Sequence, residues 1–167
     1  MLKNNKGYSL VELVIYVSLM AIIILVVVNT VLSFTKTYKE VGALRIVEHS
    51  GEDAMERMTR EIRGATSIDN ANSTLGTSPG VLTLISGPSG ATKVTKFYVQ
   101  NYILKMDING SYYGPLSLSN ASVTSMTFRD LSSGISHAVK LDLTIQGTSG
   151  TITKTKTYHS TIILKGQ

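Results

Sequence analysis

The sequence predicts an α+β protein in which one long N-terminal helix, with a transmembrane first half, packs on a C-terminal antiparallel β-sheet head. Three observations point to this class. Residues 8–28 form an almost wholly apolar run, and no proline occurs between Met1 and Ser78. Apolar residues then recur at three- and four-residue steps as far as residue 62. Beyond residue 80 the period changes to two, which is typical of strands.

The apolar run is long enough to cross a membrane. Its polar exceptions are Ser9, Glu12 and Ser18. As a helix, about 21 residues extend about 30 Å, which matches the thickness of a hydrocarbon core. A buried helix of a soluble domain is the alternative interpretation. We favour a membrane span because residues 21–28 are hydrophobic on every face.

The residues ahead of the run indicate its orientation and processing. Lys3 and Lys6 precede it, so the positive-inside rule predicts a cytoplasmic N-terminus and an exported C-terminal part. An ordinary secretory signal has a small-residue cleavage site after its apolar stretch, and residues 26–30 offer none. The small residue, Gly7, instead stands before the run and directly ahead of Tyr8.

This N-terminal stretch resembles the cleavage motif of type IV prepilins and type II secretion pseudopilins. The matching residues are Lys6-Gly7-Tyr8-Ser9-Leu10-Val11-Glu12-Leu13, with a Gly before a hydrophobic residue and Glu at the fifth place after the cut. The resemblance implies that a prepilin peptidase cuts after Gly7 and that the new N-terminus, Tyr8, is N-methylated. The family more often has Phe or Met at the position of Tyr8.

Glu12 also indicates function by itself. A carboxylate in the bilayer interior costs on the order of 3 kcal/mol, so such a residue is expected to have a role. The alternative is that Glu12, four residues past Tyr8, reaches the interface. If cleavage frees an amine at Tyr8, Glu12 of one subunit is a natural partner for the amine of its neighbour in a filament. The family resemblance implies the same role in subunit assembly.

The helix is expected to continue past the membrane with one apolar stripe. The stripe consists of Phe34, Tyr38, Val41, Leu44, Val47, Met55, Met58 and Ile62. Gly51 interrupts it and is a candidate for a kink or a break, because an interior glycine costs about 1 kcal/mol relative to alanine. Gly64 is the expected end of the helix, after basic residues in the last turn.

The head is predicted to be an antiparallel meander whose apolar face is covered by the helix. Residues 67–80, rich in Asn, Ser, Thr and Gly, predict a loop. The expected strands are 81–85, 93–100, 102–108, 111–113, 123–129, 139–145 and 151–164. Asn109-Gly110 is a strong hairpin signal, and 147–150 is expected to form the last turn. The 139–145 segment alternates apolar and polar residues and is therefore predicted to be half-buried.

Composition and motif searches exclude several classes of function. The chain has 167 residues, which allows one modest domain and an anchor, and it has no cysteine, which excludes disulfides and thiolate chemistry. Its three histidines lie far apart, no elbow motif of serine hydrolases occurs, and no metal or cofactor is expected. Scattered aspartates leave calcium binding open. Net charge is +5, or +3 without Lys3 and Lys6, so nucleic acid is a disfavoured partner that stays open.

The head also resembles one branch of the family. The helix end at residues 60–65, the strand at 97–99 and the last strand at 161–165 resemble the J-type minor pseudopilins and W-type minor pilins. The domain organisation expected from both resemblances is a leader at 1–7, a transmembrane assembly helix at 8–30, its amphipathic continuation at 31–66 and the β head at 67–167.

The sequence and its resemblance to the family therefore predict a non-enzymatic minor subunit of a type IV pilus or type II secretion pseudopilus. Expected partners are other pilins or pseudopilins, the prepilin peptidase, an inner-membrane assembly platform and membrane lipid. Expected localisation is a single-pass bacterial cytoplasmic membrane protein that later enters an extracytoplasmic filament. The alternatives are an uncleaved anchored adhesin or receptor, which leaves the spacing of Gly7 and Glu12 unexplained, and an anchored enzyme, for which no catalytic constellation was found.

Overall fold

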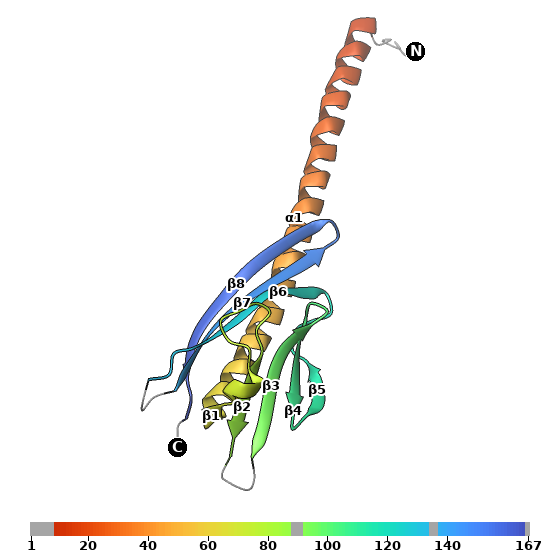
Figure 1. The fold of residues 1–167 in the computed structure, drawn as a ribbon. Helices are drawn as coiled ribbons and strands as arrows, with labels where there is room; N and C mark the ends of the chain where they lie inside the picture. The colour runs from red at the N-terminus through yellow and green to blue at the C-terminus, as the bar shows by residue number, and fades with distance from the viewer. Residues whose placement is uncertain (1–8, 88–91, 134–136, 166–167) are drawn as a thin grey trace. The chain divides into compact units, whose positions relative to one another are not determined.

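The computed structural model describes residues 9–87, 92–133 and 137–165 (Figure 1). It contains two compact units, Met1–Tyr38 and Lys39–Gln167, which are described separately below. One helix, α1 (Leu10–Gly64), has residues in both units. The predicted processing residues Lys3, Lys6, Gly7 and Tyr8 lie outside the described part of the chain.

In the first unit, α1 carries the predicted apolar segment. The helix has one stretch that is long and apolar enough to cross a membrane, near its N-terminus. Two hydroxyl groups here bond to the backbone of the helix: Ser18 and Thr30 each donate to the carbonyl four residues earlier, at 2.8 Å. Such bonds remove the need for a water partner, which an apolar surrounding would not supply. This segment is therefore suited to lipid or to packing among other apolar helices.

In the second unit, α1 buries a face made largely of small residues. Its buried residues are Ala43, Val47, Ser50, Gly51, Ala54, Met58 and Ile62. The predicted stripe is confirmed at Val47, Met58 and Ile62, and Met55 is half-buried. The prediction is wrong for Val41 and Leu44, which are exposed. The face of the helix that packs on the sheets has smaller side chains, which permit a closer approach of the helix to the strands. Phe34 and Tyr38, in the first unit, are exposed as well.

Two antiparallel sheets form the rest of the second unit. Their strands are β1 (Ser67–Ile68), β2 (Leu82–Ser86), β3 (Lys93–Gln100), β4 (Ile103–Ile108), β5 (Ser111–Pro115), β6 (Ala121–Asp130), β7 (Ala138–Ser149) and β8 (Ile152–Ile163), with a 3-10 helix η1 (Asn70–Asn72) after β1. The first sheet has the order β1-β2-β3-β4-β5 and the second the order β6-β7-β8. The α+β class is confirmed, but the predicted single meander is divided into two sheets.

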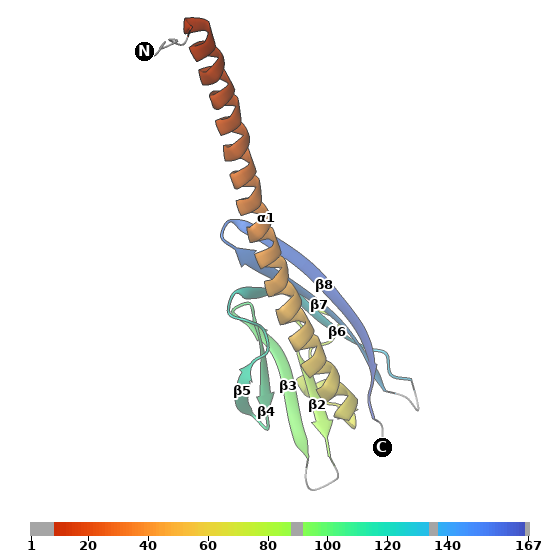
Figure 2. The same cartoon turned by 180° about the vertical axis from the view of Figure 1, so that it is seen from behind.

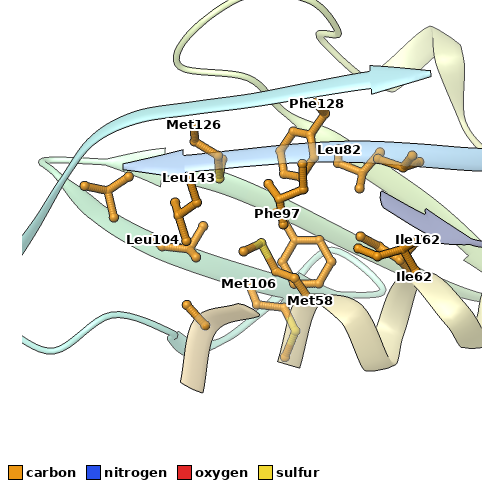
Figure 3. Packing of buried hydrophobic residues seen from close by; sticks show 14 of the residues in the cluster. Met58, Ile62, Leu82, Phe97, Leu104, Met106, Met126, Phe128, Leu143 and Ile162 are labelled. Carbon is orange, nitrogen blue, oxygen red and sulfur yellow. The ribbon is translucent and has the colours of Figure 1, made fainter. Parts of the chain in front are cut away.

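Both sheets cover the same face of the C-terminal part of α1, so that the helix lies in front of them in Figure 2. A single apolar cluster joins the helix to both of them. Figure 3 shows Met58 and Ile62 of α1 close to Phe97 and Met106 of the first sheet, with Phe128 and Leu143 of the second sheet above. All of the predicted inward positions of the 139–145 segment are fully buried, so its alternation is confirmed. Burial of each large apolar side chain contributes about 1.5–3 kcal/mol.

Hairpin turns fix the registers of the strands. The predicted Asn109-Gly110 turn is confirmed: both residues have positive φ, 51° and 78°, and the Asn109 side chain accepts a hydrogen bond from the Val94 amide at 2.8 Å. The β3–β4 hairpin turns at Asn101 and Tyr102, also with positive φ, so Tyr102 is a turn residue and not the first residue of a strand as predicted.

The last hairpin differs from the prediction at Gly147. The strand β7 continues through Gly147 to Ser149, which pairs with Ile152, so the turn is confined to Gly150 and Thr151. A Cβ at Gly147 would lie 2.8 Å from Val47 Cγ2 and 2.9 Å from the Ala43 carbonyl oxygen. This glycine is therefore a place of close approach between strand and helix, which is the other common use of glycine inside a strand.

Gly51 has the same use on the helix. The predicted kink or break is wrong, because α1 is continuous through this position. A Cβ on Gly51 would lie 2.2 Å from the ring of Tyr158 in β8, and the Tyr158 hydroxyl donates to the Val47 carbonyl at 3.1 Å. Glycine lowers helix propensity, but at this position it lets an aromatic ring pack directly on the backbone of the helix. The predicted helix end at Gly64 is confirmed.

The contact between Gly51 and Tyr158 predicts that Gly51→Ala changes the free energy of unfolding in opposite directions, depending on the residue at position 158. In the wild-type background the added methyl overlaps the Tyr158 ring, so we expect a loss of about 1–3 kcal/mol in the free energy of unfolding. In a Tyr158→Ser background the same substitution should stabilise by up to about 1 kcal/mol through helix propensity. Urea unfolding of the full chain in detergent measures both values.

Gly64→Ala is the matched control, because a Cβ there has nothing within 4 Å. We expect Gly64→Ala to change the free energy of unfolding by the same amount in both backgrounds. An equal loss from Gly51→Ala with Tyr158 and with Ser at 158 would contradict the packing argument.

Candidate functional site

Glu12 is the chemically distinct residue of the first unit. It is the only charged side chain between residues 9 and 35. It is also the only residue from 9 to 38 that is half-buried, all the others being exposed. Its position in the first turn of α1 is favourable for a negative charge, because the helix N-terminus carries a partial positive charge. An acidic group is thus held at the N-terminal end of α1, in a stretch that has no other charge as far as residue 35.

Tyr16 is a hydrogen-bond partner of Glu12. Its hydroxyl donates a hydrogen bond to Glu12 Oε1 at 3.2 Å, across one helical turn. Tyr16 was not predicted as a site residue from the sequence. The available signal was the spacing of four residues, which places a donor on the same face of a helix as the carboxylate.

The predicted cleavage motif adjoins the start of the helix. Backbone hydrogen bonding is already present between the Ser9 carbonyl and the Leu13 amide, at 3.1 Å. Gly7, Tyr8, Lys3 and Lys6 lie outside the described residues, so no geometry connects them to Glu12. Their roles in cleavage, N-methylation and orientation stay predictions.

The described part of the head includes two grooves. One, of about 650 Å³, lies between α1 and β8 and is lined by Met55, Arg60 and Tyr158 among others. The other, of about 590 Å³, lies beside β5 and includes Arg57 and Tyr113, whose ring centroid is 5.2 Å from the guanidinium carbon.

Several charged groups of the head pair with one another. Glu61 lies 3.0 Å from Arg57 and 2.6 Å from Lys93. On the edge strand β8, Lys154 and Lys156 lie 3.9 Å and 3.4 Å from glutamates of α1. The charges of Lys154 and Lys156 are therefore partly neutralised by the helix. Such surface pairs are worth about 0–1 kcal/mol each.

Two histidines are paired with aspartates. His49 Nδ1 lies 2.7 Å from Asp53 Oδ2, and His159 Nδ1 lies 2.6 Å from Asp142 Oδ1. The hydrogen bond from His159 lowers the pKa of Asp142 below its usual value. Within the described ranges, no three His, Cys, Asp or Glu side chains are grouped closely enough to hold a metal ion.

Comparison with known proteins gives one match. Residues 2–28 match the family model of the prokaryotic N-terminal methylation motif. The matched range contains Gly7, Tyr8, Glu12 and Tyr16 together with the apolar segment. Neither curated proteins nor solved structures gave a match to the chain.

The Asp142–His159 pair predicts a small pH-dependent contribution to stability. A carboxyl whose pKa is lowered in the folded state stabilises the fold above its unfolded pKa, and this contribution is lost as pH falls through the folded pKa. We expect Asp142→Asn to lower the free energy of unfolding by up to about 1 kcal/mol near neutral pH, because the pair is partly exposed and screened. The deficit should vanish in acid, measured by urea unfolding from pH about 2 to about 7.

His159→Leu tests whether the pair is responsible. In that background Asp142→Asn should have little further effect. If Asp142→Asn lowers the free energy of unfolding as much without His159 as with it, other neighbours of Asp142 are responsible for the stabilisation.

Proposed function

We propose that this chain, a member of the type IV pilin and pseudopilin superfamily by its N-terminal motif, is a minor pilin or pseudopilin subunit that enters a type IV pilus or type II secretion pseudopilus. The observation that carries the proposal is Glu12, the one carboxylate in the apolar N-terminal stretch of α1, at the fifth place after the predicted cut. A single-pass receptor or adhesin has no use for this residue at this distance from Gly7. Membrane anchoring is consistent with both the motif and the apolar stretch of α1.

In the proposed mechanism each N-terminal residue has one role. Lys3 and Lys6 keep the N-terminus cytoplasmic, Gly7 permits cleavage by the prepilin peptidase, and Tyr8 becomes an N-methylated amine. Glu12 of one subunit then neutralises the Tyr8 amine of a neighbour. Because an unpaired carboxylate in the membrane costs on the order of 3 kcal/mol, pairing favours the assembled state over the isolated subunit. Residues 13–28 pack with other subunits as the filament core.

We propose a structural and not a catalytic role for the head, in contact with other subunits or with solvent. Support for the minor branch comes from the segments that resemble it. Residues of the helix end and of the last strand adjoin each other: the Lys165 amide donates to the Ala65 carbonyl at 3.2 Å. Ala65, Ile162 and Leu164 are all buried there. The branch-like segments thus act together in closing the core at this end of the head.

The proposed partners follow from this role. They are other pilins or pseudopilins, the prepilin peptidase, the assembly platform of the cytoplasmic membrane and lipid. The motor and the peptidase are separate proteins in this proposal, and the chain itself performs no reaction.

The N-terminus of the mature chain tests the processing step. In cells with prepilin peptidase we expect the intact mass and the N-terminal peptide to begin at Tyr8 with one added methyl group. In cells without the peptidase the chain should keep Gly7 and the residues before it. A chain that retains its first residues in both strains would support the uncleaved anchored receptor or adhesin instead.

Glu12→Ala tests the assembly step. We expect normal cleavage but at least a tenfold loss of incorporation into filaments, since tenfold corresponds to about 1.4 kcal/mol and the charge pair is worth more. Quantitative immunoblotting of sheared filaments against membranes measures the ratio. Ser18→Ala, a polar change in the same segment, should incorporate normally. Incorporation of Glu12→Ala at the wild-type level would contradict the role of Glu12 in assembly.

A further inference from the structure

We propose that Tyr16 is a positioning residue for Glu12, whose hydroxyl holds one oxygen of the carboxylate while the subunit is still unassembled in the membrane. The second oxygen then remains directed toward an incoming amine. Both partners of the hydrogen bond are in the same subunit, so the bond does not require assembly. Its use in assembly rests on the proposed function.

The first argument is geometric. The Tyr16 hydroxyl lies 3.2 Å from Glu12 Oε1 and four residues further along the helix. Long side chains on a helix lean toward its N-terminus, so a residue at i+4 covers the residue at i. The exposure pattern agrees, because Glu12 alone is half-buried among exposed neighbours.

Few polar side chains in this segment could compete with Tyr16 for Glu12. Ser18, the next polar side chain beyond Tyr16, already donates to the Val14 carbonyl at 2.8 Å. Among the residues from 9 onward that the structure describes in this unit, Tyr16 is the side chain that donates to Glu12. Tyrosine suits the task because its ring is at home in an apolar surrounding and its hydroxyl is a donor.

The third argument concerns the order of events in assembly. A carboxylate accepts through two oxygens, and hydrogen bonds to ionised groups are stronger than neutral ones. The Tyr16 hydroxyl uses Oε1 and so partly replaces the water that Glu12 loses in the membrane. It also limits the rotation of the carboxylate, so less entropy is lost when a neighbouring amine binds Oε2.

The spectroscopic test uses the full processed chain in lipid vesicles. Infrared spectra of the protein with 13C-carboxyl glutamate contain the Glu12 carboxylate band, which the difference between wild type and Glu12→Gln isolates. We expect Tyr16→Phe, which keeps the ring and removes the hydroxyl, to shift this band. Tyr38→Phe is the matched control, since Tyr38 is an exposed tyrosine of the same unit. A band unchanged by Tyr16→Phe would overturn the proposal whatever the function of the chain.

The functional test measures incorporation into filaments in competition with wild type. We expect Tyr16→Phe to incorporate about threefold less well, the factor corresponding to typical side-chain hydrogen bonds in membranes. Tyr16→Gln, which restores a donor at the same spacing, should recover part of the loss. A band shift with normal incorporation of Tyr16→Phe, where Glu12→Ala is defective, would overturn the positioning role.

The proposed function fails in a different way. If neither Glu12→Ala nor Tyr16→Phe changes incorporation while the band still shifts, the hydrogen bond stands and its use in assembly is wrong. Defects in both variants, together with the band shift, support the whole proposal.

Discussion

The head depends on how closely the backbone of α1 approaches β7 and β8. Gly51 on the helix and Gly147 on the strand each occupy a place where a Cβ would come within 3 Å of the other element. Tyr158 fills the space above Gly51 and bonds to the Val47 carbonyl. With the helix this near, Met58 and Ile62 reach into a core shared with both sheets (Figure 3). Larger side chains on this face would separate the layers that the core joins.

The first unit obeys a different constraint. An apolar surrounding supplies no water, so each polar group needs a partner within the helix or on another chain. The hydroxyls of Ser18 and Thr30 satisfy theirs with backbone carbonyls, and Tyr16 serves one oxygen of Glu12. Among residues 9–35, no basic side chain is available to neutralise the negative charge of Glu12. This remaining demand is the physical reason that an assembly partner is proposed at the N-terminal end of the helix and not in the grooves of the head.

Much of the fold was predictable because local patterns carry it. The period change from helix to strand, the Asn109-Gly110 turn and the alternation around Leu141 and Leu143 all depend on neighbours in sequence. The errors arose where long-range contact decided the outcome. Val41 and Leu44 are more hydrophobic than Ala43 but lie off the buried face. Tyr102 was predicted to be a strand residue, but it has a positive φ in a turn. Its carbonyl accepts a hydrogen bond from the Val123 amide.

The sequence by itself determined the apolar segment, the motif around Gly7 and Glu12, the end of the helix and the half-buried strands, because each is written in spacing along the chain. Tertiary structure alone decided the division into two sheets and the meaning of Gly51 and Gly147. A glycine permits a break, a turn or a close approach equally well, and the choice depends on which residue packs against it. For Gly51 that residue is Tyr158, 107 positions further along the chain.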